Sequence, residues 1–137
     1  MKVLLDTDVI SELVRLRPDP NVARFVADQS DPVLSVITLH ELTYGAERAP
    51  AAARRARLGA WIQEVRAQFS GRLIEVTAQI AERSGQMRAS AAARGYSVEA
   101  LDALIAASAI SCAACVATRN TADFEPLGVG TVNPWTM

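Results

Sequence analysis

The stretch from Ala100 to Ala117, ALDALIAASAISCAACVA, decides the fold of this chain. Its apolar run is long enough for a buried helix, expected from Ser97 to about Cys112, and it leads into a short strand from Cys115 to Thr118. Asp102 is the only charged residue within the stretch. An isolated ionised carboxylate is costly to bury unless cations or hydrogen-bond donors meet it. Asp102 therefore predicts a functional site.

Three further acids follow apolar segments in the same way. Asp6 follows VLL at residues 3–5, Glu41 follows VLSVI at residues 33–37, and Asp123 follows VAT at residues 116–118. Hard divalent cations such as Mg²⁺ prefer oxygen ligands. Four carboxylates in apolar settings therefore suggest a metal site.

The bulk properties limit the class of protein. With 137 residues and 50% hydrophobic content, the chain can bury roughly two thirds of its unfolded surface as a single domain over residues 1–137. A net charge of -1 argues against holding nucleic acid by bulk positive charge, so any such contact would be local. Lys2 is the only lysine among the fourteen basic residues, which excludes mechanisms that need an internal lysine.

The two cysteines, Cys112 and Cys115, form a Cys-x-x-Cys pair at the end of the apolar run. We interpret them as core thiols, because a zinc or redox site would need further ligands and the chain has a single histidine. A reduced, cytoplasmic protein fits this interpretation. Residues 103–117 are too few for a membrane span, and residues 1–6 are too short and too soon charged for a signal peptide.

Periodicity and breaker residues predict the order of the elements. Strands are expected at residues 3–5, 32–36, 73–76 and 115–118, with a short fifth at 131–133. Helices are expected at residues 9–16, 20–29, 38–48, 50–69, 78–93 and 97–112, with Asp19 and Ser97 as N-caps and a helical hairpin at 38–69. Alternating strands and helices predict an α/β fold with a central parallel sheet of about four to five strands and helices on both faces.

In such a sheet, ligands bind outside the carboxyl ends of the strands. Asp6, Glu41 and Asp123 stand at or just after predicted strand ends, and Asp102 stands in the first turns of the helix that leads into the fourth strand. We expect the four acids to meet at one edge of the sheet.

Purely structural explanations exist for the first acids. Asp6 can simply end its strand, and Asp8 can be a helix N-cap. Thr38-x-x-Glu41 has the spacing of a capping box, which alone would account for Glu41.

The other two acids also have alternatives. A helix dipole could stabilise Asp102, but only by about 0.3 to 1 kcal/mol, up to about 2 when partly buried, which is too little for a deeply buried charge. Asn120 and Asp123 could form a turn through their side chains. The joint pattern of four acids outweighs these separate explanations.

Four motifs in order resemble PIN domains, and specifically the VapC and FitB-type toxins of bacterial toxin–antitoxin pairs. They are VLLDTDVISEL at residues 3–13, SVITLHELTYG at 35–45, DALIAA at 102–107 and TRNTADF at 118–124, and the ending VNPW at 132–135 is similar too. The resemblance spans essentially the whole chain. One position departs from it, because residue 8 is Asp where the family often has Asn.

The resemblance implies an endoribonuclease that needs Mg²⁺ or Mn²⁺. It also implies a homodimer silenced by a cognate antitoxin, in a hetero-oligomer that binds operator DNA through the antitoxin. The acids that match the family's motifs, as catalytic residues and metal ligands, are Asp6, Glu41, Asp102 and Asp123. Residues that could support the ligands or contact the substrate are Thr7, Asp8, Thr118, Arg119 and Asn120.

Several surface features have two interpretations. An arginine group at residues 48–57 is either a solvated face or an RNA contact, and it comprises Arg48, Arg54, Arg55 and Arg57. Apolar residues on the first two helices are either core or an antitoxin groove, and they comprise Val14, Leu16, Phe25 and Val26. His40 is expected to face away from Glu41 and to have no catalytic role. Trp61 and Trp135 are expected in core or interface packing.

Two other functions compete with the nuclease. Asp6-Thr7-Asp8 looks like the paired acids of haloacid-dehalogenase-type phosphatases, but those enzymes use a downstream lysine that this chain lacks. A non-catalytic PIN-like module that binds RNA or a partner would be favoured by the loss of an acid, and all four acids are present.

Overall fold

The computed structural model describes all 137 residues and alternates strands with helices. The strands are β1 (Val3–Leu5), β2 (Leu34–Ser35), β3 (Leu73–Ile74), β4 (Cys115–Ala117) and β5 (Thr131–Val132). The α-helices are α1 (Thr7–Leu13), α2 (Pro20–Ala27), α3 (Val36–Glu47), α4 (Ala52–Gln68), α5 (Ala78–Ala93), α6 (Ala100–Ser111) and α7 (Thr121–Phe124). Two short 3₁₀ helices, η1 (Glu125–Leu127) and η2 (Pro134–Thr136), complete the chain.

All strand pairs are parallel, as the sequence predicts. One sheet has the order β1-β4-β5 and the other pairs β2 with β3. Val33 joins the two sheets, because its carbonyl accepts from the Leu5 N–H and its own N–H donates to the Val3 carbonyl, both at 3.0 Å. The expected parallel sheet of about five strands is confirmed, although it is divided into three and two strands.

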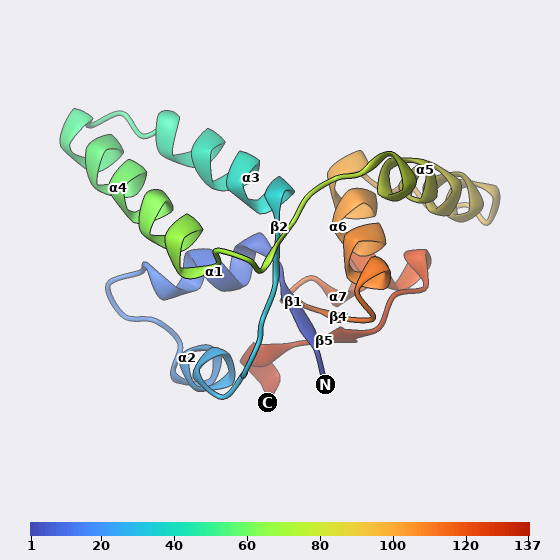
Figure 1. Cartoon of the computed structure of the whole chain (residues 1–137), viewed down its shortest axis with the longest axis horizontal. Coiled ribbons are helices and arrows are strands. Elements are labelled where there is room, and N and C mark those ends of the chain that lie inside the picture. The colour runs from blue at the N-terminus through green and yellow to red at the C-terminus, as the bar shows by residue number, and fades with distance from the viewer.

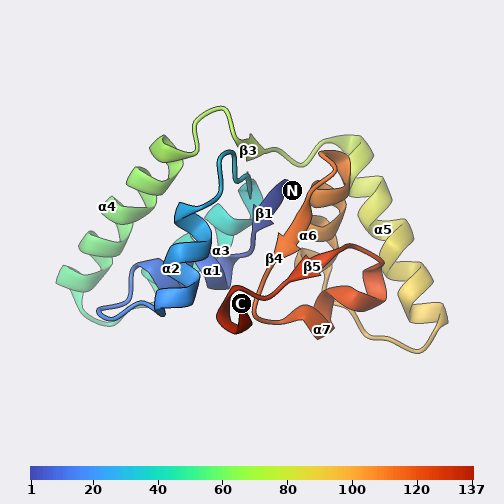
Figure 2. The same cartoon turned by 90° about the horizontal axis from the view of Figure 1, so that it is seen from below.

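Helices cover both faces of the strands (Figures 1 and 2). Side chains of β1 alternate between two buried clusters, as strand geometry requires. Val3 and Leu5 pack with α1 to α4, whereas Leu4 packs with α5, α6 and the segment after β4. Figure 1 shows α3 and α4 on one side of the strands and α5 and α6 on the other.

The predicted helical hairpin is present as α3 and α4, which pack against each other. The long helix α4 packs on the first cluster through the residues that its periodicity singled out, Leu58, Ile62, Val65 and Phe69. The hairpin fixes α3, which also contacts α1, α6 and β2.

Four helix starts differ from the prediction, and that of α4 differs least, at Ala52 instead of residue 50. α3 begins at Val36 with Ser35 as N-cap, its hydroxyl accepting from the Ile37 N–H at 3.1 Å. Thr38 is therefore not a cap, and the capping-box explanation of Glu41 is wrong. Ser35, rather than Thr38, is the N-cap because it is the last residue of β2 and α3 begins directly after it.

The N-cap prediction at Ser97 is also wrong, and so is the alternative explanation of Asp8 as an N-cap. α6 begins three residues after Ser97, with Glu99 at the N-cap position. Val98 is buried in the second core cluster, and this packing accounts for the later start. α1 begins at Thr7 and is capped by Asp6, so Asp8 lies in its first turn. The predicted Asp19 cap of α2 is confirmed.

The buried Glu12 side chain holds the connection between α1 and α2. Its Oε2 accepts from the Asp19 N–H at 2.9 Å, and its Oε1 pairs with Arg15 at 3.2 Å. Replacing Glu12 with Ala leaves the partly buried Asp19 N–H without its partner, so we expect a loss of about 1–3 kcal/mol of unfolding free energy in a urea titration. The control Arg15→Ala removes only an exposed partner and should cost less than about 1 kcal/mol. Equal losses in both variants would contradict this assignment.

The two cysteines are free thiols and both are half-buried. The Cys115 thiol faces the Lys2 carbonyl at 3.7 Å, and burial raises its pKa. Both therefore serve packing, although neither is as fully enclosed as a core thiol. None of the helices is both long and apolar enough to cross a membrane.

Candidate active site

Asp6 joins three elements at the carboxyl end of β1. Its Oδ1 accepts from the Thr7 N–H at 2.8 Å, which caps α1. Its Oδ2 accepts from the Thr118 hydroxyl at 2.8 Å, and its own N–H donates to the Ala117 carbonyl at the end of β4. The side chain is only 8% exposed. The sequence predicted that Asp6 would stand at this edge, and it also carries the cap.

Asp8 anchors the loop that follows β4. Its Oδ2 accepts from the Arg119 N–H at 2.9 Å, with Thr118 Oγ1 at 3.3 Å and Asn120 Nδ2 at 3.5 Å. Its Oδ1 is buried and has no hydrogen-bond partner. A buried polar atom without a partner requires an explanation, and a bound cation or an ordered water would supply one.

Glu41 lies in the second turn of α3 and faces α1. Its Oε1 accepts from the Thr7 hydroxyl at 2.5 Å, and that hydroxyl also lies 3.1 Å from Thr38 Oγ1. Thr38 is fully buried, so the two threonines hold the carboxylate in place. The neighbouring His40 is exposed.

Asp102 is half-buried rather than deeply buried, which corrects the expectation from its apolar surroundings. The helix starts only two residues earlier, so Asp102 lies on its open first turn beside a cavity of about 420 Å³. Asp123 lies on the same cavity, in the short helix α7, and is exposed. The Asn120 side chain donates to Asp8 and not to Asp123, so the alternative explanation of Asp123 by a side-chain turn is wrong.

The acids influence one another's protonation. Burial raises the pKa of Asp6 to about 7, with further contributions from the charges of Asp8 and Glu41. Burial also raises the pKa of Asp102 to about 6, followed by repulsion from Asp123 and Glu41. Acids on α1, α3, α6 and α7 therefore lie near enough for their charges to act on one another.

The sequence did not identify the roles of two residues in this region, Glu99 and Thr38. Glu99 lines the same cavity as Asp102 and contributes to the repulsion that raises its pKa. It stands three residues before Asp102, which is a same-face spacing on a helix and was a usable signal. Thr38 was interpreted only as a cap, and nothing in the sequence showed that it would meet Thr7.

A second cavity, of about 450 Å³, includes Glu41 and none of the other three acids. It is bordered by α1, α3 and α4 and contains Val14, Leu16 and Trp61. Val14 and Leu16 are 39% and 97% exposed. Of the apolar residues proposed for an antitoxin groove, these two are therefore available. The other two are Phe25, which is buried, and Val26, which is half-buried against the first core cluster.

Two arginines of the group at residues 48–57 already interact with other residues of this protein. Arg55 donates to the Ala49 and Pro50 carbonyls at 2.7 and 3.0 Å, and Arg48 stacks on Tyr44. Arg54 lines the cavity beside Glu41 and has no protein partner. The predicted basic face therefore reduces to Arg54 and Arg57.

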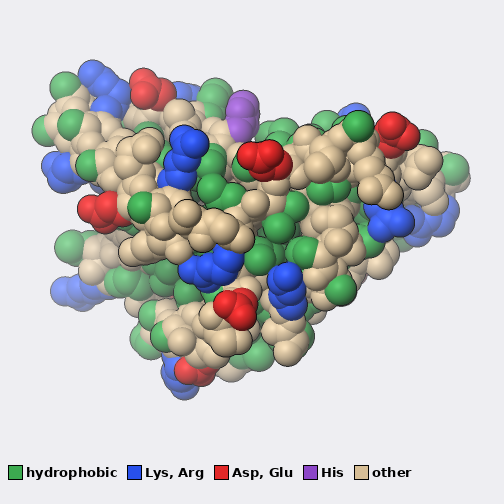
Figure 3. All heavy atoms as spheres, viewed as in Figure 1, with side chains coloured by type: hydrophobic (Ala, Val, Ile, Leu, Met, Phe, Trp, Pro, Cys, Tyr) green, Lys and Arg blue, Asp and Glu red, His purple; other side chains and the backbone are tan.

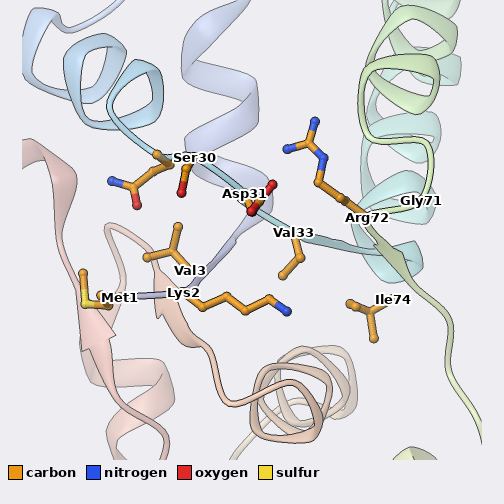
Figure 4. Close-up of a pocket in the computed structure, with 10 residues that line it drawn as sticks. Met1, Lys2, Val3, Ser30, Asp31, Val33, Gly71, Arg72 and Ile74 are labelled. Atoms are coloured by element: carbon orange, nitrogen blue, oxygen red, sulfur yellow. The ribbon is translucent and has the colours of Figure 1, made fainter.

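Another cavity, of about 480 Å³, lies at the amino ends of β1, β2 and β3 (Figure 4). Lys2, Asp31 and Arg72 border it, together with apolar side chains. Arg72 is occupied with the Pro32 and Gln68 carbonyls. None of the predicted site residues reaches this cavity. Figure 3 shows that basic and acidic side chains are interspersed on the face viewed there, without a large patch of one sign.

The donor set suits a hard divalent cation, but it is not a finished cage. No three His, Cys, Asp or Glu side chains lie close enough together to hold a metal ion as they stand. The unpartnered Asp8 Oδ1 favours the arrival of a positive charge, and so does the repulsion that Glu41 and Asp8 exert on both Asp6 and Asp102. Mg²⁺ commonly keeps several waters and takes only one or two carboxylates plus substrate phosphate. An open, oxygen-rich cluster fits that ion.

A parallel α/β domain with an acid cluster at the carboxyl edge of its strands is the arrangement that the resemblance to PIN domains predicts. Comparison with known families agrees, because the PIN domain family matches residues 3–127. Relatives include the VapC ribonuclease Y4jK of Sinorhizobium fredii, 34% identical over 97% of both chains. Toxin FitB of Neisseria gonorrhoeae is 33% identical over 97% of this chain and 98% of FitB.

Solved structures agree with these relatives. FitAcB from Neisseria gonorrhoeae aligns with a TM-score of 0.92 and 32% identity over 98% of this chain and 99% of that one. DNA-bound VapBC from Salmonella typhimurium aligns with a TM-score of 0.76 and 31% identity over 98% of both chains. The chain therefore belongs to the PIN domain family, and within it to the VapC and FitB-type toxins.

Proposed function

We propose that this protein is a metal-dependent endoribonuclease toxin that is silenced by a cognate antitoxin. The observation that carries the proposal is the placement of Asp6 and Glu41 at the carboxyl end of β1, where Thr7 donates to both carboxylates, with Asp102 near enough to feel the charge of Glu41. Support comes from the relatives, which are a VapC ribonuclease and, in Salmonella typhimurium, a tRNA(fMet)-specific endonuclease VapC that is 32% identical over 98% of both chains. Residues 1–137 would act as one PIN domain.

Four carboxylates would hold Mg²⁺ or Mn²⁺. Asp6 and Asp102 are the first choices for direct ligands, and Asp123 would bind directly or through water. Such an ion supplies an activated water and offsets negative charge on the scissile phosphodiester. A second ion, if present, would stabilise the leaving oxygen.

The chain's own residues position these groups. Thr7 holds Oε1 of Glu41, which leaves Oε2 free to orient the attacking water. The Thr118 hydroxyl donates to Oδ2 of Asp6, and this hydrogen bond restricts rotation of the carboxylate. Asp8 ties down the loop that leads to Asp123, through Arg119 and Asn120. Preorganised ligands of this kind reduce the reorganisation that a reaction requires.

The relatives' structures support protein partners. The neighbours are complexes such as FitAB bound to a DNA fragment and VapBC bound to DNA. By analogy, this chain would pair with an antitoxin whose apolar segment covers Val14 and Leu16 in the cavity beside Glu41. The toxin would form a homodimer, and the hetero-oligomer would bind operator DNA through the antitoxin. A cytoplasmic location agrees with two free thiols.

The test is cleavage of a labelled RNA pool by antitoxin-free protein, with Mg²⁺, with Mn²⁺ and with EDTA. We expect cleavage with either metal and none in EDTA, because the carboxylates alone repel the phosphate. Calorimetric titration of Mg²⁺ in parallel shows whether the protein is competent to bind. Folded, metal-binding protein that binds RNA without cleaving it would instead establish the non-catalytic module.

A further inference from the structure

Arg119 lies at the rim of the acid cluster, on the loop between β4 and α7. Its backbone N–H donates to Asp8 at 2.9 Å. The preceding residue, Thr118, donates its N–H to the Val132 carbonyl and its hydroxyl to Asp6. The start of this side chain is therefore fixed by neighbours on both sides. Burial raises the pKa of Asp8, and the positive charge of the nearby Arg119 guanidinium offsets part of that rise.

The far end of the side chain is also held. The Arg119 guanidinium carbon lies 5.0 Å from the centre of the Trp135 ring, within the range of a cation–π contact. Trp135 is itself anchored, because its N–H donates to Asn133 Oδ1 at 2.9 Å and its carbonyl accepts from Asn21 of α2. The ring also packs against the first core cluster. Arg119 is thus an exposed cation with little freedom to move.

The guanidinium donors of Arg119 remain unused. It makes no side-chain hydrogen bond, and the one ion pair in the structure joins Arg15 to Glu12. Other arginines, such as Arg55, Arg72 and Arg88, spend their donors on backbone carbonyls. A planar donor fork held on an aromatic ring is well suited to a phosphate group, which it can bind through two parallel hydrogen bonds.

We propose that Arg119, positioned by Trp135, binds a backbone phosphate of the RNA next to the scissile bond. This proposal rests on the proposed nuclease function and deepens it. It also accounts for how a chain of net charge -1 can approach a polyanion through an acidic site. One fixed cation at the rim gives the RNA a point of attachment and a register, while the acids hold the ion that the reaction needs.

The experiment measures binding of a fluorescein-labelled single-stranded RNA pool to the full-length protein in the Asp102→Asn background, with Mg²⁺, over a range of salt concentrations. We expect Arg119→Ala to weaken binding by about tenfold and to lower the slope of log K against log salt by about 0.7, the value for one lost phosphate contact on a single strand. Arg119→Lys keeps the charge but loses the fork, so it should fall between the two. The matched control is Arg83→Ala, which removes an exposed arginine of α5 and should leave affinity and slope unchanged.

Trp135 is tested as a positioning residue by a double-mutant cycle. Trp135→Phe keeps an aromatic ring but weakens the cation–π contact, so we expect it to weaken RNA binding about threefold when Arg119 is present and not at all in the Arg119→Ala background. A purely structural role for Trp135 would give the same loss in both backgrounds, which would overturn the positioning role.

The outcomes separate this proposal from the proposed function. If the protein with native Asp102 cleaves RNA with metal while Arg119→Ala leaves affinity and salt slope unchanged, the Arg119 proposal is wrong and the nuclease stands. If Arg119→Ala instead weakens only capture of the antitoxin, Arg119 belongs to the protein interface and the RNA contact is likewise refuted. Failure of the native-Asp102 protein to cleave RNA under any metal condition refutes the proposed function itself.

Discussion

Replacing Asp102 with Asn is expected to reduce metal-dependent RNA cleavage by about a thousandfold while the protein stays folded. The amide removes the negative charge that a divalent ion requires, and losing about 4 kcal/mol of transition-state stabilisation corresponds to that factor. Folding should not suffer, because burial and repulsion from Asp123 already disfavour the ionised carboxylate. The measurements are single-turnover cleavage rates with Mg²⁺ and the melting temperature without it.

Glu99 provides a matched control for this variant. It lies on the same cavity and the same helix end as Asp102, but it does not match an acid of the family's motifs. Glu99→Gln should reduce the rate by less than about tenfold, the scale of a neighbouring charge rather than a ligand. An Asp102→Asn variant that remained fully active and metal-dependent would remove Asp102 from the site.

Without metal, the protein is expected to lose stability as the pH rises from about 4 to about 7. Asp6 has a pKa of about 7 in the folded protein against 3.8 in an ordinary environment, so the folded state holds its proton longer than the unfolded chain does. The protonated Asp6 therefore contributes to the free energy of unfolding at low pH, and this contribution is lost as the pH rises to the pKa that Asp6 has in the folded protein. Between about pH 5 and pH 7 this amounts to about 2–3 kcal/mol, and Asp102 acts in the same direction.

The measurement is urea unfolding in EDTA at several pH values, repeated with saturating Mg²⁺. Bound metal should abolish most of the pH dependence, because it favours the ionised carboxylates. Asp6→Asn keeps a residue that caps helices well and should flatten the EDTA profile. A stability that rises with pH over this range in EDTA would show that Asp6 is ionised in the folded protein and would contradict the prediction.

The sequence was sufficient for the arrangement of the elements and for the edge where the acids meet. Apolar runs and helical periodicity depend on local order along the chain, and they correctly placed β1, α5 and the hairpin of α3 and α4. Parallel strands share one carboxyl edge, so Asp6 and Glu41 were brought together by topology alone. The matching motifs then supported the family.

The predictions that were wrong depend on contacts between residues that lie far apart in the sequence or on burial in the core. Thr38 was expected to cap a helix, yet its hydroxyl meets Thr7 of another helix. Ser97 lost its capping role because the neighbouring Val98 is drawn into the second core cluster. The stacking of Arg119 on Trp135 joins the loop after β4 to the end of the chain. None of these contacts leaves a local pattern.

The two sheets are joined only through Val33, and this has a mechanical consequence. Glu41 lies in the helix that follows β2, in the half of the molecule with the β2–β3 pair. Asp6, Asp102 and Asp123 lie next to β1 and β4, in the half with the three-stranded sheet. An ion or substrate that engages both groups acts as a cross-link between the two halves of the molecule. Occupying the site should therefore restrict movement between the two halves. A change that separates the halves should abolish activity without replacing any of the acids.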